Sequence, residues 1–247
     1  MQNKLTEHQI KNFQIDVFVR DQISDFKYLF GEIFRGKNVV DIGGGIGLFA
    51  EILSETLGVK VRMIDADYDS VKLALSRGIN AQIDDALSPK INGNENLACF
   101  NLILHHLVAS TESETFKLQR KALTVWRPYV DAVFVNEYVY ESFFKDLSTR
   151  LIYEITKNTL LSKLCSFIAK FFPSLKANTF GVGVRFRSLT DWYKVFKDAG
   201  FDVVQVVCGD DEYISWPRKI LLIKKINRIS FYLKPNYLTP LGTESRY

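Results

Sequence analysis

The stretch NVVDIGGGIGLFA, residues 38–50, decides the fold of this 247-residue chain. Apolar residues and Asp41 lead into four glycines within five positions, and the chain then becomes apolar again. Glycine loses the most conformational freedom on folding, so a cluster this dense indicates that something approaches the backbone closely. The pattern predicts a short buried strand, a glycine-rich turn, and a helix that ends at Gly58.

Strands and helices alternate along the chain that follows this turn. The patterns predict strands at residues 60–65, 79–84, 100–106, 131–138, 202–208 and 219–225, and helices at residues 5–34, 69–78, 110–126 and 189–201. Alternation at this spacing is typical of a doubly wound α/β fold, with a mostly parallel sheet covered on both faces. We expect seven strands, the last of them antiparallel because its connection is short.

The same reading divides the chain into regions. We expect an N-terminal helical cap at residues 1–36 and a Rossmann-like domain at residues 37–226. A mostly helical insert, residues 141–188, separates the fifth and sixth strands of that domain, and a basic tail follows at residues 227–247.

Composition narrows the class of protein. Apolar residues make up 47% of the chain, enough for a sizeable core, and the net charge of +4 is too slight to indicate a nucleic-acid partner. The three cysteines have no CxxC spacing, and no metal-ligand cluster is seen, so we expect no bound metal. Without an apolar leader or a spanning segment, we expect a soluble, cytoplasmic protein.

The glycine turn matches the pattern D-x-G-x-G-x-G, as Asp41, Gly43, Gly45 and Gly47. By this motif the chain resembles the class I S-adenosylmethionine-dependent methyltransferases, over residues 37–225 apart from the insert. The stretch DWYKVFKDAGFDVVQV, residues 191–206, also resembles the helix, Ala-Gly-Phe turn and sixth strand of that family. The dinucleotide pattern G-x-G-x-x-G fits less well, because Leu48 or Ala50 stands where its third glycine belongs.

The resemblance implies a site for S-adenosyl-L-methionine. The residues it places there are Asp41, Gly43, Gly45, Gly47, Asp65, Ala66, Asp85, Ala86 and Leu104. Asp65 would accept hydrogen bonds from the ribose hydroxyls, and Asp85 one from the adenine amino group. Two alternatives stay open: Asp65 could merely cap the following helix, and Asp84 and Asp85 could be solvated loop acids.

Methyl transfer from a sulfonium needs an aligned acceptor, and a base only when the acceptor must lose a proton. His105 and His106, at the end of the expected fourth strand, are candidates for that base. Glu137, ending the fifth strand, is a candidate for substrate contact. The alternative is that these residues only pack, cap or hydrogen-bond within the protein.

Several absences guide the choice of acceptor. In the family that the chain resembles, enzymes that methylate adenine or cytosine in nucleic acids carry an Asn/Asp-Pro-Pro-aromatic motif after the fourth strand, and cytosine C5 enzymes carry a Pro-Cys nucleophile. Neither motif occurs in this sequence, so we expect a small-molecule acceptor rather than a nucleic-acid base. Leu160, Leu161, Leu164 and Phe167 begin an apolar helical stripe in the insert. As a lid, that stripe would suit a partly apolar acceptor, methylated on oxygen, nitrogen or carbon. The same stripe could instead pack on the core, on a second subunit of a homodimer, or weakly on a membrane surface.

Other readings remain at this point. Arg185 and Arg187 could bind a substrate anion, or could be exposed strand residues. The rival functions are an RNA methyltransferase supported by the basic tail, an NAD-linked oxidoreductase, and a non-catalytic module that binds S-adenosyl-L-methionine.

Overall fold

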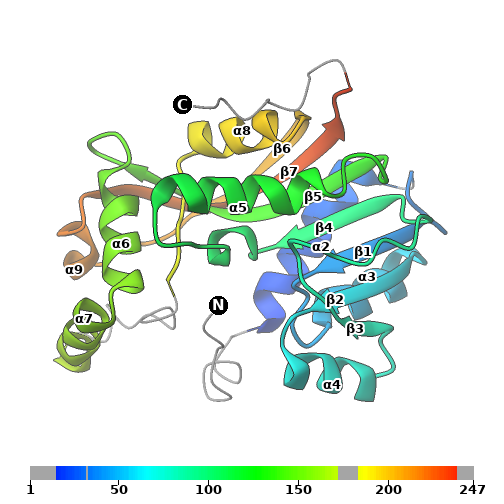
Figure 1. The fold of residues 1–247 in the computed structure, drawn as a ribbon, viewed down its shortest axis with the longest axis horizontal. Helices are drawn as coiled ribbons and strands as arrows, with labels where there is room; N and C mark the ends of the chain where they lie inside the picture. The colour runs from blue at the N-terminus through cyan, green and yellow to red at the C-terminus, as the bar shows by residue number, and fades with distance from the viewer. Residues whose placement is uncertain (1–14, 32, 172–182, 238–247) are drawn as a thin grey trace.

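The computed structural model describes residues 15–31, 33–171 and 183–237, which form a seven-stranded sheet of order β3-β2-β1-β4-β5-β7-β6 (Figure 1). The strands are β1 (Asn38–Ile42), β2 (Lys60–Asp65), β3 (Ala81–Ile83), β4 (Leu97–Asn101), β5 (Ala132–Ser142), β6 (Phe201–Asp211) and β7 (Ile223–Pro235). Strands β1 to β5 pair in parallel, and β7 runs antiparallel to both β5 and β6. The predicted doubly wound fold with an antiparallel last strand is confirmed.

Helices cover both faces of this sheet (Figure 1). The described helices are α2 (Ile15–Phe30), α3 (Leu48–Leu57), α4 (Tyr68–Ser76), α5 (Glu112–Thr124), α6 (Leu147–Lys157), α7 (Thr159–Phe171), α8 (Leu189–Asp198) and the short α9 (Trp216–Lys219). On one face, α5 and α8 bury Trp126, Trp192 and Phe196 against the sheet. On the other face, α2 and α3 pack around Phe134, and α4 packs against Met63.

The N-terminal region, expected as a helical cap, contributes helix α2 to one face of the sheet. Helix α2 packs on the sheet, where Phe26 and Phe30 contact the ring of Phe134 in the interior strand β5. Gln22 also donates a hydrogen bond to Asn136 of that strand. The described part of residues 1–36 therefore packs on the sheet, and residues 1–14 lie outside the described residues. The expected capping of the cofactor stays a prediction.

The C-terminal boundary differs from the expectation. The last strand begins at Ile223 and continues to Pro235, so residues 227–235 of the stretch expected as a basic tail lie inside the sheet between β5 and β6. Short helix α9, with Pro217 in its first turn, occupies the place where that strand was expected to start. Residues 238–247 lie outside the described residues.

The insert supplies two helices, α6 and α7, at one end of the molecule, on the left in Figure 1. After it the chain returns to the sheet: Arg187 forms a parallel bridge with Val139, and Arg185 N donates to the carbonyl oxygen of His105. This returning segment, residues 183–188, thus lies beside β5 beyond the point where β4 ends. It forms a wall between the carboxyl edge of the sheet and α5.

Candidate functional site at the carboxyl edge of the sheet

The glycine-rich turn joins β1 to α3, and its glycines serve different purposes. Gly43 and Gly47 have φ angles of +69° and +82°. A Cβ at Gly43 would lie 2.5 Å from Ile103 Cδ1, and one at Gly47 would lie 2.4 Å from Ile79 Cδ1. Packing within the protein therefore already explains these two glycines.

Gly45 is different, because a Cβ added there would meet no atom of the described residues within 4 Å. Its φ of +56° is in the left-handed region, and its amide donates a 2.8 Å hydrogen bond to Asp65 Oδ2 at the end of β2. Asp65 Oδ1 accepts from the amide of Asp67, the N-cap of α4. Gly45 thus presents bare main chain to open space, beside a carboxylate on the neighbouring strand tip.

Beneath the turn lie two polar side chains, Asp41 and Asn101, whose hydrogen-bonding capacity is only partly used. Asp41 is fully buried, and its Oδ1 accepts a 3.2 Å hydrogen bond from Asn101 Nδ2 at the end of β4. Asp41 Oδ2 and Asn101 Oδ1 are buried without a partner in the described part of the chain. Burial raises the pKa of Asp41 to about 7, against the opposing effect of the Asn101 hydrogen bond. Two unpaired acceptors fit a ligand group that brings positive charge and N–H donors.

The other residues expected at the cofactor site lie in different settings. Ala66 is exposed beside Asp65, and Asp85 is exposed in the loop after β3, where it accepts from the amide of Leu87. Ala86 is half-buried against the core. The side chain of Leu104 is fully buried in the core, so only its main chain can face a ligand. The roles proposed for these residues stay predictions.

The two histidines do not end a strand as expected. β4 stops at Asn101, Leu102 takes a φ of +54°, and Leu104–His106 form a turn of 3-10 helix, η1. Alternation along a strand would have placed the two imidazoles on opposite faces. Instead their ring centroids lie 4.2 Å apart.

The carboxylate of Glu137 in β5 holds the η1 turn in place through hydrogen bonds. It is fully buried, its Oε1 accepts from the amide of Leu104 at 2.7 Å, and its Oε2 lies 2.7 Å from His105 Nδ1. Both carboxylate oxygens are therefore engaged inside the protein. This arrangement lets Glu137 hold the imidazole of His105, and its expected contact with a substrate stays a prediction.

Aromatic rings surround His105 beyond the end of β4. Phe186 stacks on His105 with centroids 4.8 Å apart and on Tyr140 with centroids 4.4 Å apart, and Tyr138 meets Phe186 edge-on. Burial raises the pKa of both tyrosines, so they stay neutral phenols. Burial, with a smaller contribution from His105, also lowers the pKa of His106 well below its ordinary value. These rings form an apolar, uncharged wall around one fixed imidazole.

No protein-family model and no curated protein matches this sequence. Among solved structures, the magnesium protoporphyrin IX methyltransferase of Synechocystis PCC 6803, with bound SAH, is 13% identical, with a TM-score of 0.56 over 96% of this chain and 90% of that one. Geranyl diphosphate methyltransferase is 12% identical, with a TM-score of 0.54 over 87% of this chain and 77% of that one.

The chain has the class I methyltransferase fold. The same fold is shared by the cyclase SpnF, which is 12% identical, with a TM-score of 0.56 over 90% of this chain and 81% of that one. At these identities the likeness establishes the fold, and chemistry has to be argued from the site.

Within this fold, Arg185 and Arg187 of the returning segment are buried, which rules out the alternative that they are exposed strand residues. Arg185 is 1% and Arg187 2% exposed, and both are ion-paired with Glu112 at the start of α5. Among the described residues no cluster of three metal-ligating side chains occurs, and none of the described helices is long and apolar enough to cross a membrane.

Asn101 and the aromatic wall were missed by sequence reasoning. Asn101 carries a readable signal, since it is a polar residue that closes an otherwise apolar strand, LACFN. The aromatic wall carries none, because Tyr138 and Phe186 stand 48 positions apart and meet only through the bridge between Val139 and Arg187.

Proposed function

We propose that this chain is an S-adenosyl-L-methionine-dependent methyltransferase that acts on a small, partly apolar molecule. The observation that carries the proposal is the open main chain at Gly45, flanked by Asp65 on the next strand and by the unpaired acceptors of Asp41 and Asn101. A ligand here needs a flat, hydroxyl-bearing part against the glycine turn and an ammonium near Asp41. S-adenosyl-L-methionine has both.

The residues present fit that cofactor. The ammonium would supply donors to Asp41 Oδ2 and Asn101 Oδ1, and its positive charge would favour the ionised form of Asp41. Asp65 keeps acceptor capacity on both oxygens beyond its bonds to Gly45 and Asp67, because each carboxylate oxygen can accept more than one hydrogen bond. The ribose hydroxyls would use that capacity.

When bound, the cofactor supplies an electrophilic methyl group on a good leaving group. The chain's own residues then have to position the acceptor and take up any proton it loses. His105 suits the second task. Its Nδ1 faces the carboxylate of Glu137, so the neutral ring carries its proton on Nδ1 and leaves Nε2 with a free lone pair. His105 is therefore our choice for the base, with Glu137 as the residue that positions it.

The aromatic wall supports a partly apolar acceptor. Phe186, Tyr138 and Tyr140 offer ring surface next to His105, and such surface favours an apolar or aromatic body with a polar accepting atom near the imidazole. An oxygen or nitrogen acceptor fits a base at this place best, and a carbon acceptor fits if it is acidic.

The rival functions lose support at specific residues. Among the basic residues near the C-terminus, Lys225 and Arg228 lie in β7, where Lys225 pairs with Asp211 and Arg228 pairs with Asp21. The oxidoreductase rival would need a second half-site for a dinucleotide at the same turn. A non-catalytic module would have no need of the buried His105–Glu137 pair.

Binding and turnover test the proposal separately. Calorimetry with S-adenosylhomocysteine should show binding, and NADH should show none. Incubation with the methyl-labelled cofactor and fractionated small-molecule extracts should then label one fraction. Binding of S-adenosylhomocysteine without any labelled product from the extracts would favour the non-catalytic module instead.

A further inference from the structure

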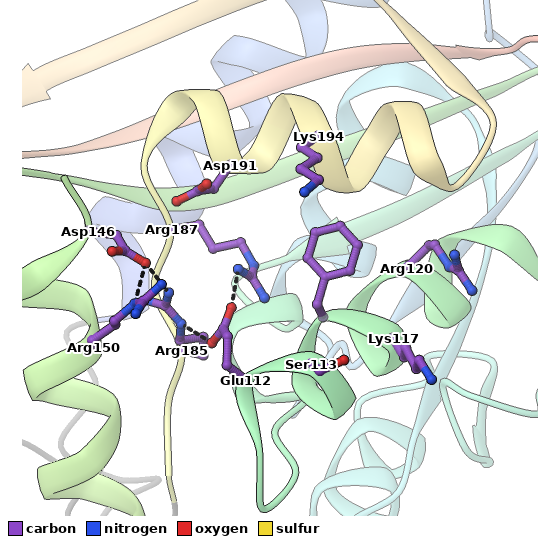
Figure 2. A pocket seen from close by; sticks show the side chains of 11 residues that line it. Glu112, Ser113, Lys117, Arg120, Asp146, Arg150, Arg185, Arg187, Asp191 and Lys194 are labelled. Atoms are coloured by element: carbon purple, nitrogen blue, oxygen red, sulfur yellow. Dashed lines mark hydrogen bonds and ion pairs between the residues drawn. The ribbon is translucent and has the colours of Figure 1, made fainter. Parts of the chain in front are cut away.

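A second pocket of about 570 Å³ lies away from the glycine turn, between α5, α8 and the insert (Figure 2). That volume is in the range of sites for small organic ligands. Six basic side chains and three acidic ones line it, so positive charge is in excess. The basic residues are Lys117, Arg120, Arg150, Arg185, Arg187 and Lys194.

The acidic side chains of this pocket are already engaged. Glu112 accepts from both Arg185 and Arg187, and Asp146 accepts from Arg150 and Arg185, as the dashed lines in Figure 2 show. Asp191 accepts from the hydroxyl of Ser188, the N-cap of α8. The charges of Glu112 and Asp146 are therefore offset by arginines in the pocket wall, whereas Asp191 is held by a neutral hydroxyl.

The remaining cations are not offset in this way. Lys117, Arg120 and Lys194 form no ion pair with any carboxylate of the described residues. Lys117 and Arg120 stand three positions apart on α5, so they share one helical face, and Lys194 comes from α8. The pocket thus gathers, from two helices, three cations that form no ion pair within the described part of the chain (Figure 2). The Nζ of Lys194 lies 5.6 Å from the centroid of the Phe116 ring.

Arg187 adds an independent indication of a ligand. It is 2% exposed, its Nε donates to Gln119 and its Nη1 to Glu112, and its Cζ lies 5.2 Å from the centroid of the Phe116 ring. Its Nη2 is buried and has no hydrogen-bond partner among the described residues. A buried guanidinium nitrogen without an acceptor is costly, and the residue lines the pocket. An anion in the pocket would supply the missing acceptor.

This pocket is separate from the acceptor region. Arg185 and Arg187 point to the α5 side of the returning segment, where they meet Glu112, whereas Phe186 between them stacks on His105 on the other side. Neighbouring residues of an extended segment face opposite ways, so one short segment separates the two sites.

We propose that this second pocket binds the phosphate group of a small phosphomonoester. A phosphate carries up to two negative charges and several acceptor oxygens, which suits three unpaired cations and an unpaired Arg187 Nη2 better than the single charge of a carboxylate. The volume leaves room for an organic body beyond the phosphate. The inference does not depend on the methyltransferase proposal, because it uses none of the same residues.

Line broadening in ³¹P NMR tests the site with glycerol 3-phosphate as the probe, on the full chain. We expect binding by the wild type, at least about tenfold weaker binding by K117A/K194A, and no change in the matched control K60A/K72A. All four lysines are exposed, so both variants should fold. Arg187 is left intact because replacing a buried, ion-paired residue risks unfolding the chain.

Three results would overturn the proposal. One is equal weakening in both lysine pairs, which would indicate diffuse surface charge. Another is that H105A loses binding while K117A/K194A binds as tightly as the wild type, which would place the phosphate in the acceptor region. The third is binding to vesicles that contain phosphatidic acid, with none to soluble glycerol 3-phosphate, which would indicate a lipid headgroup. Acetate at the same concentration should not compete.

Discussion

His105 Nδ1 lies 2.7 Å from Glu137 Oε2, and this carboxylate has no contact with solvent. The same carboxylate holds the η1 turn through the amide of Leu104. One buried acid therefore sets both the place and the orientation of the imidazole. A residue held this firmly at the carboxyl edge of the sheet is suited to accept a proton from a bound molecule.

His105→Ala should lower kcat by about 10²–10⁴-fold, the usual contribution of a general base, with the affinity for S-adenosylhomocysteine unchanged. His106→Ala is the matched control, since it removes a neighbouring imidazole. Turnover measured with the identified acceptor decides this. Equal activity in the two variants would leave no histidine base.

Glu137→Gln keeps the size of the side chain but removes its charge. The imidazolium formed during proton uptake would lose its partner, so kcat should fall and the acidic limb of the pH–rate profile should move to lower pH. A loss of kcat with an unshifted profile would indicate that Glu137 supports the turn only.

Gly45→Ala and Gly43→Ala should separate ligand binding from folding. Both positions have positive φ, so each alanine costs about 1–2 kcal/mol of stability. At Gly43 the clash with Ile103 adds about 1–3 kcal/mol, whereas the new methyl at Gly45 points into open space. We expect Gly45→Ala to stay folded in urea titrations but to bind S-adenosylhomocysteine at least about tenfold more weakly. Unchanged affinity in the folded Gly45 variant would mean that no ligand approaches the turn there.

Asp41→Asn should stabilise the ligand-free protein in a pH-dependent way. The folded carboxyl, with a pKa of about 7, holds its proton where the unfolded one, near 3.8, has lost it. Wild-type stability at this site therefore falls as pH rises from about 4 to 7, by up to about 4 kcal/mol, and the asparagine avoids that loss. In urea unfolding, the free energy of unfolding of the variant should exceed that of the wild type by more at pH 8 than at pH 5. The variant should also bind the cofactor more weakly. An equal difference at both pH values would contradict the raised pKa.

Asp65→Ala should weaken binding of S-adenosylhomocysteine by about 1–3 kcal/mol, the usual loss for a hydrogen bond to a charged group. Asp69→Ala is a suitable control, because Asp69 is an exposed acid in the first turn of α4. If calorimetry gives both variants wild-type affinity, Asp65 only holds Gly45 and Asp67.

The sequence predicts the alternating elements well because their causes are local. The glycine turn, the capping box of α5 at Thr111 and Glu114, and the C-cap at Gly58 each act within a few residues. The order of strands follows from the handedness of crossovers, which is also general.

The remaining features depend on contacts between distant residues. Arg185 and Glu112 lie 73 positions apart, so the burial of that arginine could not be read from its own neighbourhood. The end of β4 depends on Asn101 turning toward Asp41, 60 positions earlier, which moves both histidines from the expected strand into the η1 turn.

Calorimetric titration of the unliganded chain with S-adenosylhomocysteine and, in a separate experiment, with NADH tests the central claim most directly. The account predicts saturable binding of S-adenosylhomocysteine, weakened in Gly45→Ala and Asp41→Asn, and no heat from NADH. Binding of NADH with no binding of S-adenosylhomocysteine would contradict it.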